Sequence, residues 1–174
     1  HTPEGVRDIY NGECSQKRKV QEKIHRVFHQ YGYEDIETPT FEYFEVFSRE
    51  VGTIPSKELY KFFDREGNTL VLRPDFTPSV SRACATYFNP EKEPVSLCYT
   101  GNTFINNTSY RGHLKETTQM GVERIGDESA DADAELLAMT VECLLAAGLT
   151  EFQVSVGQVD YFKSLLQDAG LDTE

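Results

Sequence analysis

The sequence predicts an α+β domain in which an antiparallel sheet is flanked by helices. Helical segments surround a run of short β-like segments that are mostly joined by turns, and this order is typical of an antiparallel sheet covered by helices. The chain has 174 residues, of which 39% are apolar and 26% charged, and this is enough for one ordinary core. We therefore expect residues 1–174 to form a single domain, the N-terminal part of a longer chain.

The first half of the chain begins with a long amphipathic helix at residues 14–31. Apolar side chains recur there at helical spacing, at Val20, Ile24, Val27, Phe28 and Tyr31. Gly32 follows as a helix stop. A strand at residues 33–36 and a short helix at residues 41–47 come next, and the segments 58–64 and 69–73 should form a hairpin.

The second half opens with a helix at residues 77–87, because Thr77 can cap a helix start and Pro78 is tolerated in the first turn. Three strands are then expected, at residues 95–99, 102–106 and 116–125. Acidic residues within 127–133 favour the start of another helix, which Gly148 ends. An alternating strand at 152–156 and a helix at 158–169 complete the predicted elements.

Composition excludes several classes of function. The formal charge is −12 and the sequence pI is about 4.8, which disfavours binding along nucleic-acid phosphates. The one basic run, Lys17-Arg18-Lys19, is interpreted as a solvated helix face. No apolar run approaches the ~20 residues of a membrane span. The four cysteines have no disulfide-framework spacing, so we expect a soluble cytoplasmic protein with reduced thiols.

No metal or cofactor is expected. His25 and His29 stand four residues apart on the first helix, which could bring two imidazoles together, but no third ligand is apparent in the sequence.

Several segments, in their order and spacing, resemble one family. They are Thr2-Pro3-Glu4-Gly5-Val6-Arg7-Asp8, Tyr31 to Pro39, Leu72 to Thr77, and Gln119-Met120-Gly121-Val122-Glu123. The chain resembles the catalytic domain of histidyl-tRNA synthetase, a class II aminoacyl-tRNA synthetase. It resembles more closely the non-ligating relatives, the regulatory subunits of short-form ATP phosphoribosyltransferase. The resemblance implies a class II synthetase-like sheet, with Tyr31 to Pro39 in a homodimer interface.

The same resemblance implies a pocket for an amino acid. Asp75, Thr77 and Gln119 would contact the α-ammonium group, and Glu123 would accept an imidazole N–H, as charge-assisted hydrogen bonds allow. A structural interpretation is also open: Asp75 would cap the helix that begins near Pro78, while Gln119 and Glu123 would merely alternate on one face of a strand.

Four positions depart from the synthetase pattern. Counted back from Gln119 without a gap, the positions of an arginine, a glutamate and two loop arginines fall on Ile105, Asn107, His113 and Lys115. Arg111 falls where the synthetase needs no arginine. The first arginine holds the ATP α-phosphate and the substrate carboxylate, and Ile105 presents no donor to either. We therefore expect no catalytic residues and no ligation, because adenylyl transfer depends on such electrostatic stabilisation.

Three hypotheses follow. The first is a noncatalytic regulatory subunit that pairs, as a homodimer within a hetero-oligomer, with the short catalytic subunit of ATP phosphoribosyltransferase in histidine biosynthesis. Histidine would bind either the pocket above or a subunit interface. The second is a histidyl-tRNA synthetase with a divergent motif 2, and the third is a pseudo-synthetase sensor or scaffold with another partner.

Overall fold

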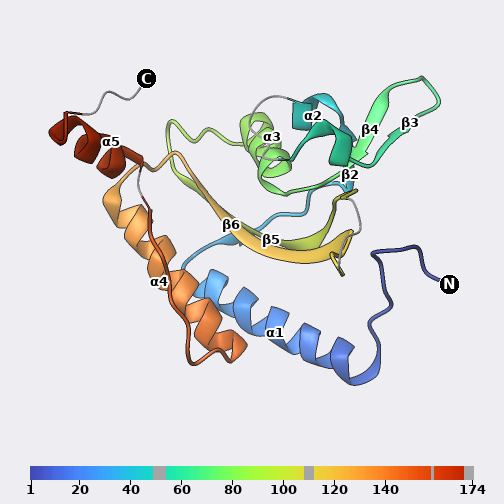
Figure 1. Ribbon diagram of the computed structural model, residues 1–174, viewed down its shortest axis with the longest axis horizontal. Helices are drawn as coiled ribbons and strands as arrows, with labels where there is room; N and C mark the ends of the chain where they lie inside the picture. Colours follow the sequence, from blue (N-terminus) through green and yellow to red (C-terminus); the bar gives the residue numbers. More distant parts are fainter. Residues whose placement is uncertain (49–53, 108–111, 158, 171–174) are drawn as a thin grey trace.

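The computed structural model describes residues 1–48, 54–107, 112–157 and 159–170, and its centre is a long two-stranded ribbon with helices on both sides (Figure 1). Strands β5 (Val95–Phe104) and β6 (Glu116–Ile125) pair antiparallel over their whole length. Strand β1 (Glu34–Asp35) adds to β5 in parallel, so the sheet order is β1-β5-β6. The predicted α+β class with an antiparallel sheet is confirmed, with one short parallel strand at its edge.

Strand β5 is continuous where two strands were predicted. Gly101 lies inside it, opposite Gln119, and the register continues from Leu97 to Phe104 without a bulge. A glycine in a strand weakens the strand pattern in the sequence, although it often marks a close approach of another group. Here Gly101 marks such an approach, because the Phe76 ring and the Arg73 guanidinium lie against it.

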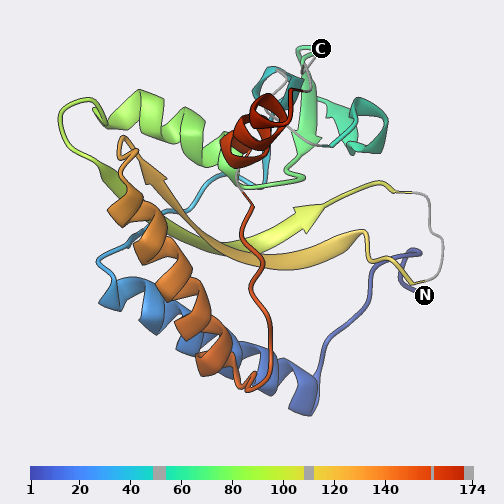
Figure 2. The ribbon, with the colours of Figure 1, turned by 60° about the vertical axis from the view of Figure 1, so that its left-hand side comes forward.

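One face of this sheet is covered by two long helices, α1 (Asn11–Gln30) and α4 (Ala130–Ala147), which lie side by side in both views (Figures 1 and 2). Val27, Phe28 and Met139 are buried with Cys98 of β5 in one apolar cluster. Ser129 caps α4 by accepting a hydrogen bond from the backbone N–H of Ala132 at 3.2 Å. Both helices were predicted, with boundaries within a few residues.

The opposite face carries helix α3 (Thr77–Tyr87), as Figure 2 shows. Phe76 and Val80 pack there against Leu97 and Tyr99 of β5. Alternating residues of a strand point to opposite faces. Cys98 therefore belongs to the α1/α4 side, while its neighbours Leu97 and Tyr99 belong to the α3 side.

A second small sheet lies beyond α3, in the order β2-β4-β3. It consists of β2 (Phe41–Tyr43), β3 (Lys61–Phe63) and β4 (Thr69–Leu72), with α2 (Glu45–Ser48) and a 3-10 turn (Ser56–Glu58) beside it. The predicted hairpin is confirmed. The predicted helix at residues 41–47 is half wrong, because the first three residues pair with β4 and only the rest is helical.

The chain continues after α4 through an extended segment into helix α5 (Val159–Asp168). The strand predicted at 152–156 is wrong: no strand is assigned at these residues, and Phe152, Val154 and Val156 are all exposed. Their alternating pattern has no neighbouring strand to complete it. Among the described helices, none has the length and apolarity required to cross a membrane.

Candidate ligand-binding site

The four predicted pocket residues come together between α3 and β6. Asp75 and Thr77 lie at the start of α3, and Gln119 and Glu123 lie on β6 at positions that share one face. Thr77 Oγ1 donates to Glu123 Oε1 at 2.6 Å, and Gln119 Nε2 donates to Asp75 Oδ1 at 3.3 Å. Residues more than forty positions apart in the chain therefore form one polar cluster.

The helix-cap interpretation of Asp75 finds no support in this geometry. The residue before α3 is Phe76, and no side chain donates or accepts a cap hydrogen bond there. Asp75 Oδ1 accepts from the adjacent Phe76 N–H at 2.7 Å, which fixes the carboxylate locally. The hydroxyl of Thr77, which was expected to cap the helix, is directed to Glu123 instead.

Two aromatic rings form the floor of this cluster, and the sequence did not single them out. The rings of Phe76 and Tyr99 stack with centroids 4.3 Å apart and planes 10° apart. Tyr99 also lies next to Glu123, with its hydroxyl 3.5 Å from Oε1. The two residues are 23 positions apart in the chain, and only the packing of α3 on β5 brings their rings together.

Two glycines make room for these rings. A Cβ on Gly121 would lie 2.4 Å from the Tyr99 hydroxyl oxygen, and a Cβ on Gly101 would lie 2.8 Å from the Phe76 ring and 2.6 Å from the Arg73 guanidinium. Both glycines have extended backbones, so the requirement is space rather than an unusual φ. Each glycine lets an aromatic ring lie flat against β5 and β6.

Arg73 holds the Phe76 ring in place through contacts with backbone oxygens and with the ring itself. Its guanidinium donates to the carbonyl oxygens of Asn102 and Thr38, each at 2.8 Å, and stacks 4.1 Å from the Phe76 ring centroid. The side chain is 8% exposed, and burial lowers its pKa. Because its donors are directed to backbone carbonyls, Arg73 joins the second sheet to β5 and does not take over the phosphate-binding role that Ile105 lacks.

The electrostatics of the cluster favour a cation. Burial raises the pKa of Glu123, and the nearby charge of Asp75 raises it further, although the Thr77 hydroxyl acts in the opposite direction. Burial likewise raises the pKa of Tyr99, and the charge of Glu123 contributes. A positively charged ligand group would stabilise the ionised form of both carboxylates, which burial and their mutual repulsion disfavour.

Ile105 lies just past the end of β5, where its N–H donates to the carbonyl of Lys115 at 2.9 Å. This bond extends the ladder, so the alternation of β5 places Ile105 on the same face as Gly101 and Thr103. An apolar side chain therefore stands on the side of the sheet that carries Glu123. Asn107, His113 and Lys115 follow between the strands, and Arg111 lies outside the described residues.

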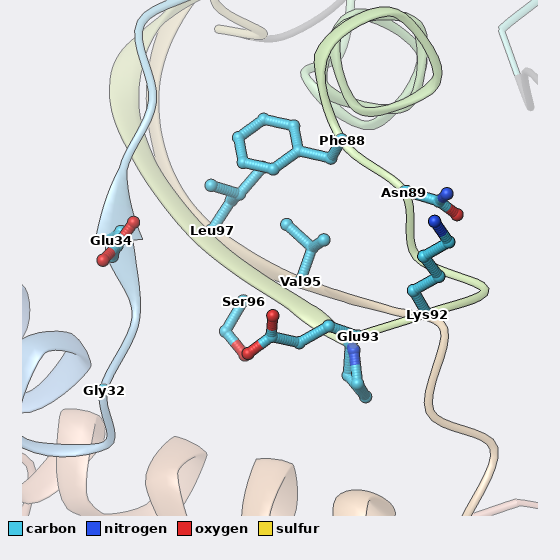
Figure 3. Close-up of a pocket in the computed structure, with 10 residues that line it drawn as sticks. Gly32, Glu34, Phe88, Asn89, Lys92, Glu93, Val95, Ser96 and Leu97 are labelled. Atoms are coloured by element: carbon cyan, nitrogen blue, oxygen red, sulfur yellow. The ribbon is translucent and has the colours of Figure 1, made fainter.

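A separate groove lies elsewhere on the described part of the chain. Its volume is about 550 Å³, and it is bounded by β1, the start of β5 and the segment that links α3 to β5 (Figure 3). Glu34, Phe88, Lys92 and Leu97 line it, and none of the four predicted pocket residues does. We favour the Asp75–Glu123 cluster as the candidate site because its polar groups converge, whereas the groove is wide and open.

Taken together, a helix-covered antiparallel sheet with an acceptor-rich cluster at its centre defines a class II aminoacyl-tRNA synthetase-like domain. Residues 5–174 match the family described as histidyl-tRNA synthetase. The chain belongs to this family.

Relatives and solved structures agree with this assignment. The chain is 45% identical over 174 residues to an ATP phosphoribosyltransferase regulatory subunit of Ruminiclostridium cellulolyticum. It is 43% identical over 174 residues to an ATP phosphoribosyltransferase regulatory subunit of Acetivibrio thermocellus. Each alignment covers all of this chain and 42% of the relative. The chain thus spans about two-fifths of the length of these relatives.

Two solved structures show the fold and its variants. The first, from Bacillus halodurans C, is described as an ATP phosphoribosyltransferase regulatory subunit/histidyl-tRNA synthetase; it has a TM-score of 0.85 and 38% identity over 97% of this chain and 43% of that one. The second is apo histidyl-tRNA synthetase of S. aureus, with a TM-score of 0.71 and 31% identity over 86% of this chain and 35% of that one.

Proposed function

We propose that this chain belongs to a noncatalytic regulatory subunit of ATP phosphoribosyltransferase, which the short catalytic subunit requires for activity and for feedback by histidine at the first step of histidine biosynthesis. The observation that carries the proposal is Ile105, an apolar side chain on the sheet face where a ligase needs a guanidinium. The names of the similar relatives supply the partner. The protein would act in the cytoplasm, without nucleic acid or cofactor.

The loss of the arginine argues against ligation on physical grounds. A guanidinium offers a permanently charged, bidentate fork to the α-phosphate, and its removal costs on the order of several kcal/mol of transition-state stabilisation. Arg73 cannot replace it, because its donors are directed to the backbone oxygens of Thr38 and Asn102. The fold would therefore retain amino-acid binding and lack adenylate formation.

Histidine fits the retained cluster as a ligand. Asp75, Thr77 and Gln119 would meet the α-ammonium, and the buried carboxylate of Glu123 would accept the imidazole N–H. The stacked Phe76 and Tyr99 provide an apolar floor of suitable size. Histidine would change the activity of the catalytic subunit only to the extent that it binds one conformational state of the hetero-oligomer more tightly than another.

Exposed aromatic side chains support the proposed homodimer. Phe41 is 50% exposed and Tyr43 is 55% exposed on β2, and Phe63 of β3 is 72% exposed. By contrast, Tyr33, which lies in the segment Tyr31 to Pro39 that resembles the family's dimer interface, is buried within this chain. Aromatic residues are enriched at the buried centres of interfaces, so the second sheet is the surface that we assign to the dimer contact.

The deciding experiment measures the activity of the short catalytic subunit with and without the full-length protein, during a titration with histidine. We expect activity only with both proteins, and inhibition by histidine. Histidine-dependent pyrophosphate exchange by the full-length protein should stay at background. Pyrophosphate exchange at ordinary synthetase rates would reject the regulatory function and favour a divergent synthetase. If the protein neither changes the activity of the catalytic subunit nor catalyses exchange, a sensor with another partner is favoured.

A further inference from the structure

Four potential metal ligands converge between α1 and the edge of the main sheet. His25 Nε2 lies 2.7 Å from Asp35 Oδ1, His29 Nε2 lies 2.9 Å from Asp35 Oδ2, and the two imidazole nitrogens are 3.1 Å apart. Cys98 Sγ lies 3.6 Å from Asp35 Oδ1. One ligand atom from each of the four side chains can be chosen so that all lie within 4.8 Å of one another.

The fold positions these side chains in two independent ways. His25 and His29 are separated by four residues on α1 and therefore lie one above the other on one helix face. Asp35 and Cys98 are direct partners in the parallel register of β1 and β5, so both point from the sheet toward α1. The sequence showed the two histidines alone, because the other two residues meet them only through the parallel strand pair.

The distances suit a small tetrahedral ion. A tetrahedron with metal–ligand bonds of about 2.0 to 2.3 Å has edges of about 3.3 to 3.8 Å. The distances from Asp35 to the two imidazoles need to lengthen by about 0.5 Å to reach that geometry, which side-chain rotation permits because both histidines and Asp35 lie at the surface. Cys98 is buried and lies at the inner vertex.

The chemistry of the four ligands selects the metal. Two imidazoles, one carboxylate and one thiol are the ligand types that Zn²⁺ binds in proteins, whereas Mg²⁺ and Ca²⁺ prefer oxygen ligands. Zinc would have to displace the thiol proton, so Cys98 is the ligand that distinguishes a closed structural site from an open three-ligand site.

We propose that His25, His29, Asp35 and Cys98 form a zinc site that joins α1 to β1 and β5. Such a site crosslinks a helix to two strands, and zinc bound there stabilises the native state by mass action because the unfolded chain lacks the site. It lies on the α1/α4 side of the sheet and shares no residue with the Asp75–Glu123 cluster.

The test uses tag-free full-length protein, first stripped with a chelator and then titrated with Zn²⁺ and separately with Co²⁺. We expect one equivalent of Zn²⁺ per chain and a zinc-dependent rise in the unfolding temperature. Co²⁺ should give the visible bands of a tetrahedral site together with a near-ultraviolet sulfur-to-cobalt charge-transfer band.

Three variants sharpen the test. His29→Gln should weaken Zn²⁺ binding by about 100-fold or more, since even the loss of a supporting partner around a metal costs 10- to 100-fold. The matched control is His113→Gln, an exposed histidine outside the cluster, and it should leave the affinity unchanged. Cys98→Ser should remove the charge-transfer band while weaker Co²⁺ binding persists.

Three results would overturn the proposal. The first is an absence of Zn²⁺ binding by the wild-type protein at micromolar Zn²⁺, the second is an equal loss of affinity in His29→Gln and His113→Gln, and the third concerns Cys98→Ser. Circular dichroism of each variant separates loss of a ligand from loss of folding. A charge-transfer band that survives Cys98→Ser would exclude the four-ligand site.

Discussion

The two faces of the β5–β6 ribbon both bury apolar side chains, but the α3 face also gathers the four predicted pocket residues. On the α1/α4 face, Cys98, Met120 and Val122 pack into an apolar cluster with helix residues such as Phe28. On the α3 face, Gln119 and Glu123 alternate with the previous set and meet Asp75 and Thr77. The period of two along a strand lets one pair of strands stabilise the domain on one side and present a polar site on the other.

Stability and ligand binding are therefore expected to depend on different side chains of the ribbon. Buried apolar groups on the α1/α4 face contribute mainly to the free energy of unfolding. Buried carboxylates on the other face cost free energy unless a partner satisfies them, and such a cost is typical of functional sites. Substitutions on the two faces should therefore have different signatures.

The largest effect on stability is expected for a substitution on the α1/α4 face. Phe28→Ala removes a side chain that is 6% exposed in the main cluster, and it should lower the free energy of unfolding by about 3 to 5 kcal/mol. The measurement is urea denaturation followed by circular dichroism. The histidine affinity of the protein that remains folded should not change. A selective loss of histidine binding would contradict the view that the α1/α4 face contributes to stability and not to binding.

On the α3 face, Glu123→Gln should weaken histidine binding to the full-length protein by roughly 1 to 3 kcal/mol, because a charged hydrogen bond to the imidazole N–H is lost. Asp75→Asn should act similarly at the ammonium end. Calorimetry measures both, with the exposed Glu22→Gln of α1 as the matched control. Histidine binding that neither variant alters would move the feedback site to a subunit interface.

Gly121→Ala tests the close approach of Tyr99 to the ribbon. The new methyl group would overlap the Tyr99 hydroxyl, and overpacking of this kind costs about 1 to 3 kcal/mol of stability. Gly12→Ala in α1 is the control, since no atom lies within 4 Å of its Cβ position. Thermal unfolding should show a loss for the first and none for the second; equal unfolding temperatures would mean that Tyr99 moves away at no cost.

The pH dependence of stability separates Glu123 from the other carboxylates. Burial raises the pKa of Glu123 in the folded state, so its contribution to stability is fully present below the unfolded pKa and is lost as the pH rises through the folded pKa. The stability of Glu123→Gln relative to wild type should therefore increase from acidic to neutral pH. Urea denaturation across this range measures the difference, and a constant difference would contradict a buried, destabilised carboxylate.

The smallest effect is expected for the ligand carboxylate. Histidinol, which lacks that group, should bind about as tightly as histidine, because the position of the carboxylate-binding arginine is Ile105. Competition calorimetry compares the two ligands. Markedly tighter binding of histidine than of histidinol would indicate that another cationic side chain binds the carboxylate.

Several local elements could be predicted from the sequence alone. The apolar stripe from Val20 to Tyr31 predicted α1, and Thr77-Pro78 predicted the start of α3, because helix periodicity and first-turn preferences are local properties. The sequence likewise predicted, from Ile105, that a phosphate-binding cation is missing, and this stays a prediction. The pocket roles of Asp75, Thr77, Gln119 and Glu123 remain predictions, which the tests above address.

The contacts between distant segments could be learned only from the three-dimensional packing. The pairing of Phe41 to Tyr43 with β4 overrode a helical pattern, and the isolated 152–156 segment found no strand partner, because strand formation depends on neighbours distant in sequence. The stacking of Phe76 on Tyr99 and the approach of Asp35 and Cys98 to two histidines arise in the same way. Each depends on strand register and helix placement, which are set by long-range packing.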